Sequence, residues 1–202
     1  MIRKLAATLI VGLFATVAPL TAQVGIGLVG GYVGANISED PVTTGLTWSS
    51  KTGFAAGVSL NLLSSGNIGF GLEGLYVQKG ANASAAGFSG SEKVNYIEIP
   101  VLLRYNLTSG KGPNFFLTAG GSYSTLMSCT QVVAGQADVD CKTASDIESS
   151  DYGVVFGAGV TSGKLTLSGR YDMGMKNINS DHSVGQHVVK NRAIMALLSI
   201  HM

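Results

Sequence analysis

The sequence predicts an all-β protein, an eight-stranded antiparallel up-and-down β-barrel that spans a membrane. Three observations carry this prediction. Eight stretches of about ten residues each alternate an apolar face with a small or polar face. The gaps between the stretches alternate in length, like the short turns and long loops at opposite ends of outer-membrane barrels. Hydrophobic residues make up 46% of the chain, yet beyond the N-terminal segment no stretch is long and apolar enough for a membrane-spanning helix.

The start of the chain has the three parts of a secretory signal peptide. An Arg-Lys pair precedes residues 5–17, which are mostly apolar, and Pro19 comes before small residues at the expected cleavage site after Ala22. A membrane anchor would need about 20 apolar residues, and Pro19 ends the run earlier. We therefore expect residues 1–22 to be a signal peptide and residues 23–202 to form the barrel domain.

Each predicted strand can be tested by counting alternate positions. The second to seventh runs place large apolar residues at every second position, with small or polar residues between them. The alternation is weaker in the first run, where glycines occupy both faces, and in the last. In chain order the runs are 24–35, 54–62, 68–76, 96–107, 115–124, 152–161, 165–173 and 192–202.

Charged residues in the middle of these strands all fall on the face opposite the large apolar residues. An arginine at the lipid midplane would cost about 2–4 kcal/mol, so the charged face must be the interior. Interior charges need partners, and the interior of an eight-stranded barrel is just wide enough to be filled by side chains. We expect a paired interior charge network. Its members are Glu73, Glu98, Arg104, Arg170 and Asp172.

Tyrosines gather on the opposite, apolar face. Six of the seven tyrosines lie there, and most of the six stand near the long-loop ends of their strands. An aromatic belt at the lipid headgroups has this distribution. The apolar face is therefore expected to contact outer-membrane lipid.

The long gaps are expected to be extracellular loops that could hold an extracellular or envelope protein partner. They cover residues 37–52, 79–93, 128–150 and 176–190. Removing residues 1–22 leaves 11 basic and 12 acidic residues, a net charge of −1. No basic face suggests nucleic acid as a partner.

Cys129 and Cys141 are the only cysteines, and both lie in the longest predicted loop. In an exported protein two such cysteines favour a disulfide. A metal site is the rival interpretation, but two cysteines without a nearby histidine make a poor zinc site. The acidic residues of the same loop lack the spacing of a calcium-binding loop. The sequence gives no reason to expect a metal or another cofactor.

One strand carries a family resemblance. Residues 96–105, Tyr-Ile-Glu-Ile-Pro-Val-Leu-Leu-Arg-Tyr, resemble the Y-x-E-I-P-x-L-x-[KR]-Y strand of the outer-membrane β-barrel family that includes PorT-type proteins. Residues 30–36 and 169–174 are similar to two further segments of that family. The resemblance extends over essentially the whole mature chain. It implies an eight-stranded barrel in the outer membrane of a Gram-negative-type cell and assigns no functional residue.

Three functions follow as alternatives. The first is a non-enzymatic barrel with a structural or surface-interaction role through its extracellular loops. The second is a narrow pore or small-ligand channel. The third is a lipid-modifying enzyme, which would need a base beside an activated nucleophile. Ser199 and His201 point the same way on the last strand, but the sequence offers no acid to orient the histidine and no G-x-S-x-G motif.

Overall fold

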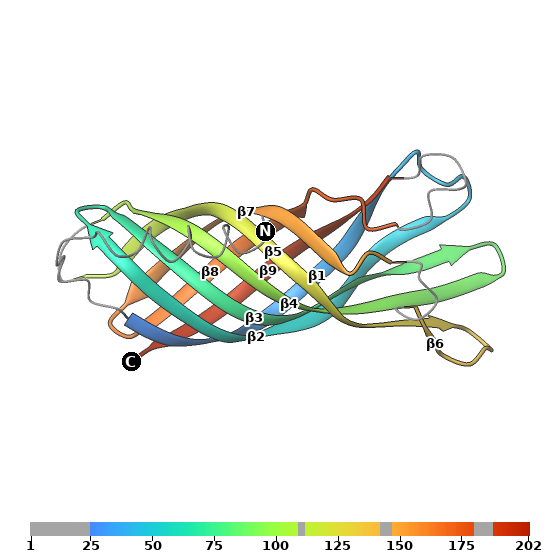
Figure 1. The fold of residues 1–202 in the computed structure, drawn as a ribbon, viewed down its shortest axis with the longest axis horizontal. Helices are drawn as coiled ribbons and strands as arrows, with labels where there is room; N and C mark the ends of the chain where they lie inside the picture. Colours follow the sequence, from blue (N-terminus) through green and yellow to red (C-terminus); the bar gives the residue numbers. More distant parts are fainter. Residues whose placement is uncertain (1–24, 109–111, 142–146, 180–187) are drawn as a thin grey trace, which may run out of the picture.

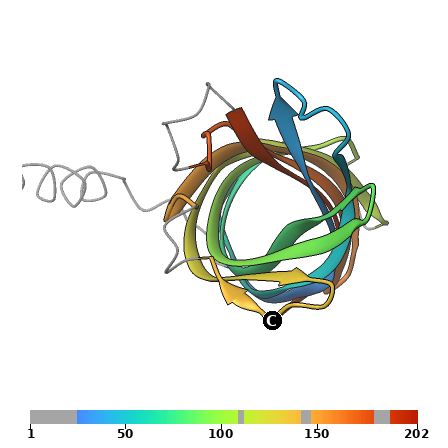
Figure 2. The ribbon, with the colours of Figure 1, turned by 90° about the vertical axis from the view of Figure 1, so that its right-hand side faces the viewer.

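The computed structural model describes residues 25–108, 112–141, 147–179 and 188–202, which form a closed barrel (Figures 1 and 2). The expected signal peptide, residues 1–22, lies outside these ranges. The strands are β1 (Gly25–Asp40), β2 (Thr47–Ser65), β3 (Ile68–Ala85), β4 (Phe88–Asn106), β5 (Asn114–Val133), β6 (Val139–Asp140), β7 (Ser150–Ser162), β8 (Leu165–Gly174) and β9 (Val188–His201). In this part of the chain no helix is long and apolar enough to cross a membrane.

Neighbouring strands pair antiparallel all the way around the ring. The order is β4-β3-β2-β1-β9-β8-β7-β5, and the pairing of β4 with β5 closes it. The two-residue strand β6 adds only a short extension to β5 outside the ring. The predicted fold class, an eight-stranded antiparallel barrel, is confirmed.

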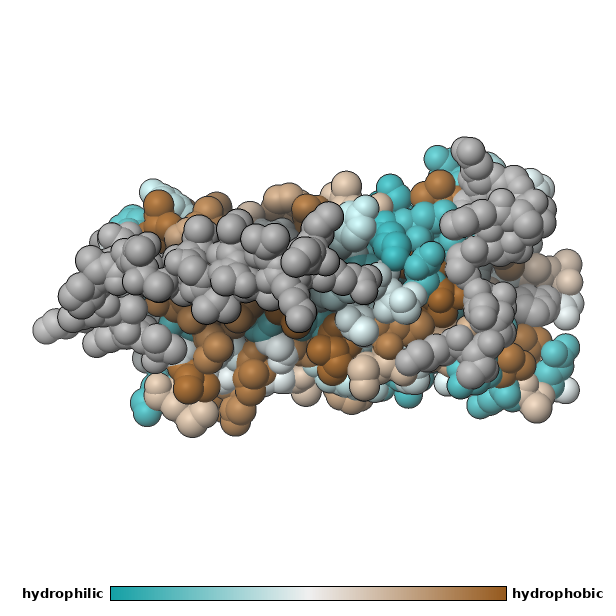
Figure 3. Space-filling model, viewed as in Figure 1, coloured by the Kyte–Doolittle hydropathy of each residue, from teal (hydrophilic) through white to brown (hydrophobic). Residues whose placement is uncertain are grey.

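The two faces of the wall meet different surroundings. On β4, the outward side chain of Leu103 is 44% exposed, whereas its inward neighbour Leu102 is 5% exposed. The outward tyrosines Tyr32, Tyr123 and Tyr152 are likewise exposed. Figure 3 shows apolar side chains along the barrel body. In an outer-membrane barrel this exterior is the surface that contacts lipid.

The connections at the two ends differ. At one end, which we call the short-turn end, the strands are joined by residues 66–67, 107–113 and 163–164. Gly66 and Gly163 have φ angles of 59° and 57°, the left-handed conformation that two-residue hairpin turns require. The other end, the hairpin end, carries the longer excursions seen on the right of Figure 1.

Two of the four predicted loops at the hairpin end are largely strand, and strands extend into the other two, which corrects their description as loops. Within 37–52 only residues 41–46 separate β1 from β2, and within 79–93 only residues 86–87 separate β3 from β4. In 128–150 β5 continues to Val133, and in 176–190 β9 begins at Val188. The extension of β3, residues 79–85, has small or polar residues on both faces. Alternation cannot reveal such strands, because neither face needs to be apolar outside the membrane.

The barrel wall splits at the hairpin end. Pairing of β1 with β2 stops at Ala35 and Lys51. Beyond that point β1 stays paired with β9 as far as Asp40, and β2 pairs with β3 again up to Thr47. The wall therefore divides into a ribbon of β1 and β9 and a sheet that starts at β2 and continues through β3, β4 and β5 to β6.

Candidate functional site

Three ionisable side chains from three strands meet inside the barrel. Lys79 of β3, Glu98 of β4 and Asp172 of β8 are 4%, 1% and 2% exposed. The Lys79 ammonium lies 2.7 Å from a Glu98 carboxylate oxygen and also pairs with Asp172. Ser124 donates to Glu98 at 3.2 Å and Ser122 to Asp172 at 3.3 Å. We call Lys79, Glu98 and Asp172 the lysine triad, whose two carboxylates share one buried cation.

Other side chains fill the barrel around the triad. The Tyr96 ring centre lies 5.7 Å from the Lys79 nitrogen. Asn191 donates to the Tyr96 hydroxyl at 3.3 Å and to the carboxylate of Asp151 at 2.8 Å. On the β1, β2, β3 and β9 side an apolar cluster is packed. It comprises Val29, Val33, Ala35, Ala55, Leu75, Val77, Ala193, Met195 and Leu197. At this level the barrel interior is occupied by packed side chains, as expected for eight strands.

A second ion pair lies nearer the short-turn end. Arg170 of β8 donates two hydrogen bonds to the carboxylate of Glu73 on β3, at 2.5 and 2.8 Å. This two-pronged geometry is the strong form of the arginine–carboxylate pair. Gly157 on the neighbouring strand β7 makes room for it, because a Cβ atom there would lie 2.9 Å from Arg170 Cγ.

Arg104 of β4 stands apart from both groups. Its Nε donates to the Asn106 side chain and its Nη2 to the Thr161 hydroxyl, each at 2.9 Å. Its guanidinium carbon lies 3.7 Å from the centre of the Phe116 ring, a cation–π contact. Among the described residues Arg104 joins no ion pair.

Hydrogen bonds continue from Arg104 around the short-turn end. The Thr161 and Thr166 hydroxyls lie 2.7 Å apart, and the Thr166 hydroxyl lies 3.0 Å from His201 Nε2. His201 Nδ1 is 3.3 Å from the Asn61 amide nitrogen. This polar chain joins β4, β7, β8, β9 and β2. Because both ring nitrogens of His201 have other partners, the geometry does not bring His201 to Ser199 as a nucleophile–base pair.

The structure divides the five residues of the expected interior network. It joins Glu98 to Asp172 through Lys79 and joins Glu73 to Arg170, while Arg104 forms no ion pair with any of the other four. Sequence reasoning missed Lys79, which it placed in a loop. A signal was present: Lys79 continues the inward parity of Glu73, Leu75 and Val77 on the same strand.

An apolar cleft lies at the hairpin end, in the split of the wall. The ribbon contributes Ile37 of β1 and Val189 of β9, and the sheet contributes Trp48, Glu92 and Gln131. Cys141, Ile147, Ile178 and Asn179 complete the lining of a space of about 180 Å³. We call it the hairpin cleft. The Trp48 indole donates to the Glu39 carboxylate at 2.9 Å, which fixes the ring across the split between β2 and β1.

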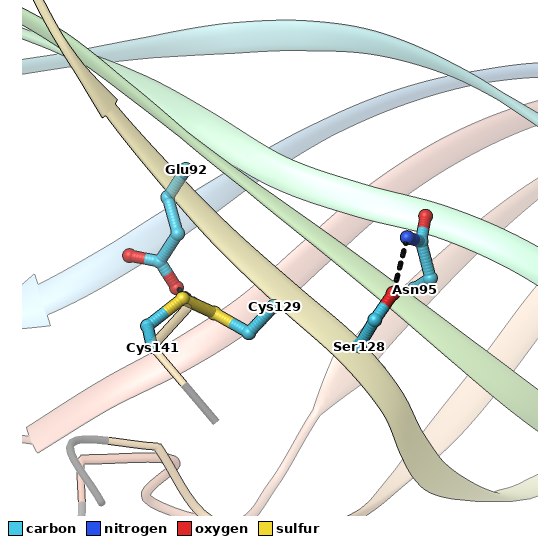
Figure 4. The surroundings of a disulfide bond; sticks show 5 residues. All are labelled: Glu92, Asn95, Ser128, Cys129 and Cys141. Atoms are coloured by element: carbon cyan, nitrogen blue, oxygen red, sulfur yellow. Dashed lines mark hydrogen bonds between the residues drawn. A yellow bond between two sulfur atoms is a disulfide. The ribbon is translucent and has the colours of Figure 1, made fainter. Parts of the chain in front are cut away.

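The expected disulfide borders this cleft. Cys129 of β5 is bonded to Cys141 immediately after β6, with Cα atoms 5.2 Å apart (Figure 4). One carboxylate oxygen of Glu92 and the two sulfur atoms lie within 4.8 Å of one another, a geometry that could suit a metal ion. The disulfide uses both sulfur atoms, however. The bond holds the β5–β6 hairpin beside the wall of the cleft.

The closed eight-stranded ring, apolar exterior, charged interior and long hairpins at one end define a small outer-membrane β-barrel protein. Residues 18–180 match the family model described as outer membrane protein beta-barrel domain, and the chain belongs to this family. The outer membrane is therefore its location. Following the rule for such barrels, the short-turn end faces the periplasm and the hairpin end the cell exterior.

Several solved structures resemble the chain. The outer membrane protein OprG from Pseudomonas aeruginosa is 12% identical, with 90% of this chain and 97% of that chain covered and a TM-score of 0.50. Ail of Yersinia pestis, solved with the heparin analogue sucrose octasulfate, is 10% identical, with coverages of 89% and 99% and a TM-score of 0.47. Neisserial surface protein A is 14% identical, with coverages of 87% and 96% and a TM-score of 0.46. Such identities speak for the fold alone. No curated protein matches the chain.

Proposed function

We propose that this protein is a non-enzymatic, non-conducting barrel that recognises an extracellular protein partner through its hairpin cleft. One observation carries the proposal: the wall splits above Ala35 and Lys51, and the split holds an apolar cleft outside the membrane. The finer likeness to PorT-type proteins rests on residues 96–105 and remains a prediction.

The size and lining of the cleft favour one kind of occupant. Its volume of about 180 Å³ is below the ~300–1,000 Å³ of typical small-molecule sites. Ile37, Ile147 and Ile178 supply an apolar lining, while Gln131 and Asn179 offer polar groups at the same cleft. Such a site suits a single aliphatic side chain presented by another protein, with the polar groups fixing the orientation of its backbone.

The lysine triad argues against a pore. Both of its carboxylates are buried and share Lys79, and packed apolar side chains fill the rest of the barrel at this level. Purified protein in planar lipid bilayers should therefore show no stable conductance. Steady, ion-selective openings of the wild-type protein would contradict the proposal and favour the channel alternative.

Recognition can be tested with the intrinsic fluorescence of Trp48, the only tryptophan in the chain. We expect short peptides that present one leucine to change this fluorescence in a saturable way, and matched lysine peptides to leave it unchanged. Ile37→Asp, which places a charge in the cleft at a half-buried position, should abolish the response. Val42→Asp is the control, because Val42 is exposed outside the cleft. An absent response, or one that survives in Ile37→Asp, would contradict the proposal.

A further inference from the structure

A second cavity lies inside the barrel at the periplasmic end. It measures about 250 Å³ and is lined by side chains of several strands. Those that matter chemically are Ser59, Glu73, Arg104, Thr166, Arg170 and His201. The cavity is separate from the hairpin cleft at the other end of the molecule, and the proposed function does not use it.

Arg104 lines this cavity and has N–H groups that form no hydrogen bond to the described residues. A guanidinium has five N–H donors, and the described contacts of Arg104 occupy two of them. Phe116 beneath the guanidinium and the bonds to Asn106 and Thr161 fix its plane. A fixed fork of N–H groups matches the geometry of carboxylate and phosphate, and little rotational freedom remains to be lost on binding.

The charge of the cavity is positive. Arg170 is neutralised by Glu73, whereas Arg104 has no carboxylate partner among the described residues. The wall of the barrel and the lipid around it have a low dielectric constant, so the attraction between this positive charge and an anion is stronger than in water.

An unpartnered hydroxyl points to the same conclusion. Ser59 is 5% exposed and lines the cavity, yet its Oγ has no hydrogen-bond partner. The Nε of Arg170, another lining residue, also lacks a partner. Buried polar atoms of folded proteins nearly always have a partner, so both donors are open to an acceptor that the cavity takes up.

We propose that this cavity binds a small oxyanion, a phosphate or a carboxylate, that enters from the periplasm. Arg104 supplies the charge and the paired N–H donors, and Ser59 supplies a neutral donor. The site selects by charge and by oxygen geometry, and its volume limits it to small anions.

The test is calorimetric titration of the folded full-length barrel in an uncharged detergent, with inorganic phosphate and with acetate as separate probes. We expect saturable binding of at least one of the two. Arg104→Gln should weaken it about tenfold or more, since charged hydrogen bonds are the strong ones. Arg192→Gln is the matched control: Arg192 donates to the carbonyl oxygens of Gly174 and Asn191 and is not among the cavity residues.

Ser59→Ala keeps the experiment decisive if Arg104→Gln fails to fold. The Ser59 hydroxyl has no partner to lose, so this variant should fold like the wild type and bind the anion several-fold more weakly. Phosphate binding without acetate binding would identify a tetrahedral site, and the reverse a planar one. The proposal is overturned if neither anion saturates, if Arg104→Gln and Arg192→Gln bind alike, or if folded Ser59→Ala binds as tightly as the wild type.

Discussion

Replacing Lys79 with methionine should show whether the lysine triad holds the barrel together. Methionine keeps most of the length of the side chain and removes the cation that pairs with both buried carboxylates. Breaking one buried ion pair by removing a partner costs about 3–5 kcal/mol, because the remaining charge is left uncompensated. The hydrogen bonds from Ser122 and Ser124 remain, so we expect a loss of about 4 kcal/mol at pH 7.

The loss should be relieved when the two acids lose their charge together with the lysine, because no buried charge is then left uncompensated. Glu98→Gln combined with Asp172→Asn in the same chain should restore most of the stability.

Urea unfolding in lipid vesicles, followed by Trp48 fluorescence, measures these changes. Lys164→Met is the matched control, because Lys164 lies exposed in the turn between β7 and β8 and should tolerate the change. If Lys79→Met is as stable as Lys164→Met at pH 7, or if the added Glu98→Gln and Asp172→Asn changes restore none of the lost stability, the triad does not stabilise the barrel as argued.

Three further predictions use the same preparation. Leu103→Arg, on the lipid face, should cost about 2–4 kcal/mol, whereas Leu102→Arg points into the periplasmic cavity and should cost less; the reverse order in urea unfolding would refute the assignment of faces. Replacing Cys129 and Cys141 by serine should lower stability by about 3 kcal/mol or less, and mass spectrometry of non-reduced wild-type peptides should show them joined; free thiols would contradict this. N-terminal sequencing of envelope material should begin at Gln23, whereas an intact Met1 would refute the predicted cleavage.

The faces of the strands were predictable because the wall of a membrane barrel has only two surroundings. Leu103 must face the lipid and Arg104 must face the interior, so two adjacent residues are enough to assign both faces of the strand. The signal ends with the membrane. From Gly80 onward β3 continues with small and polar residues, and its hydrogen bonds to β4 leave no mark on the hydrophobic pattern.

The pairing of the interior charges could not be predicted from counting. Arg170 and Glu73 are 97 residues apart, on strands that are not neighbours in the ring, and they meet across the lumen. Their meeting depends on the stagger and tilt of the whole barrel, which alternation does not encode. Arg104 also shows that counting interior acids and bases does not predict their partners, because hydrogen bonds and an aromatic ring hold its guanidinium without a carboxylate.

The glycines on the inner face of β7 are held to glycine by the backbone of the next strand as well as by the contents of the lumen. A Cβ atom at Gly157 would lie 2.6 Å from the carbonyl oxygen of Gly169 and 2.9 Å from Arg170 Cγ. One at Gly159 would lie 2.5 Å from the carbonyl oxygen of Leu167 and 2.5 Å from the Phe116 ring. A shorter side chain in the lumen would relieve only one of the two contacts at each position. Among diverging descendants of this sequence, both positions should therefore remain glycine even where residues 116 and 170 change.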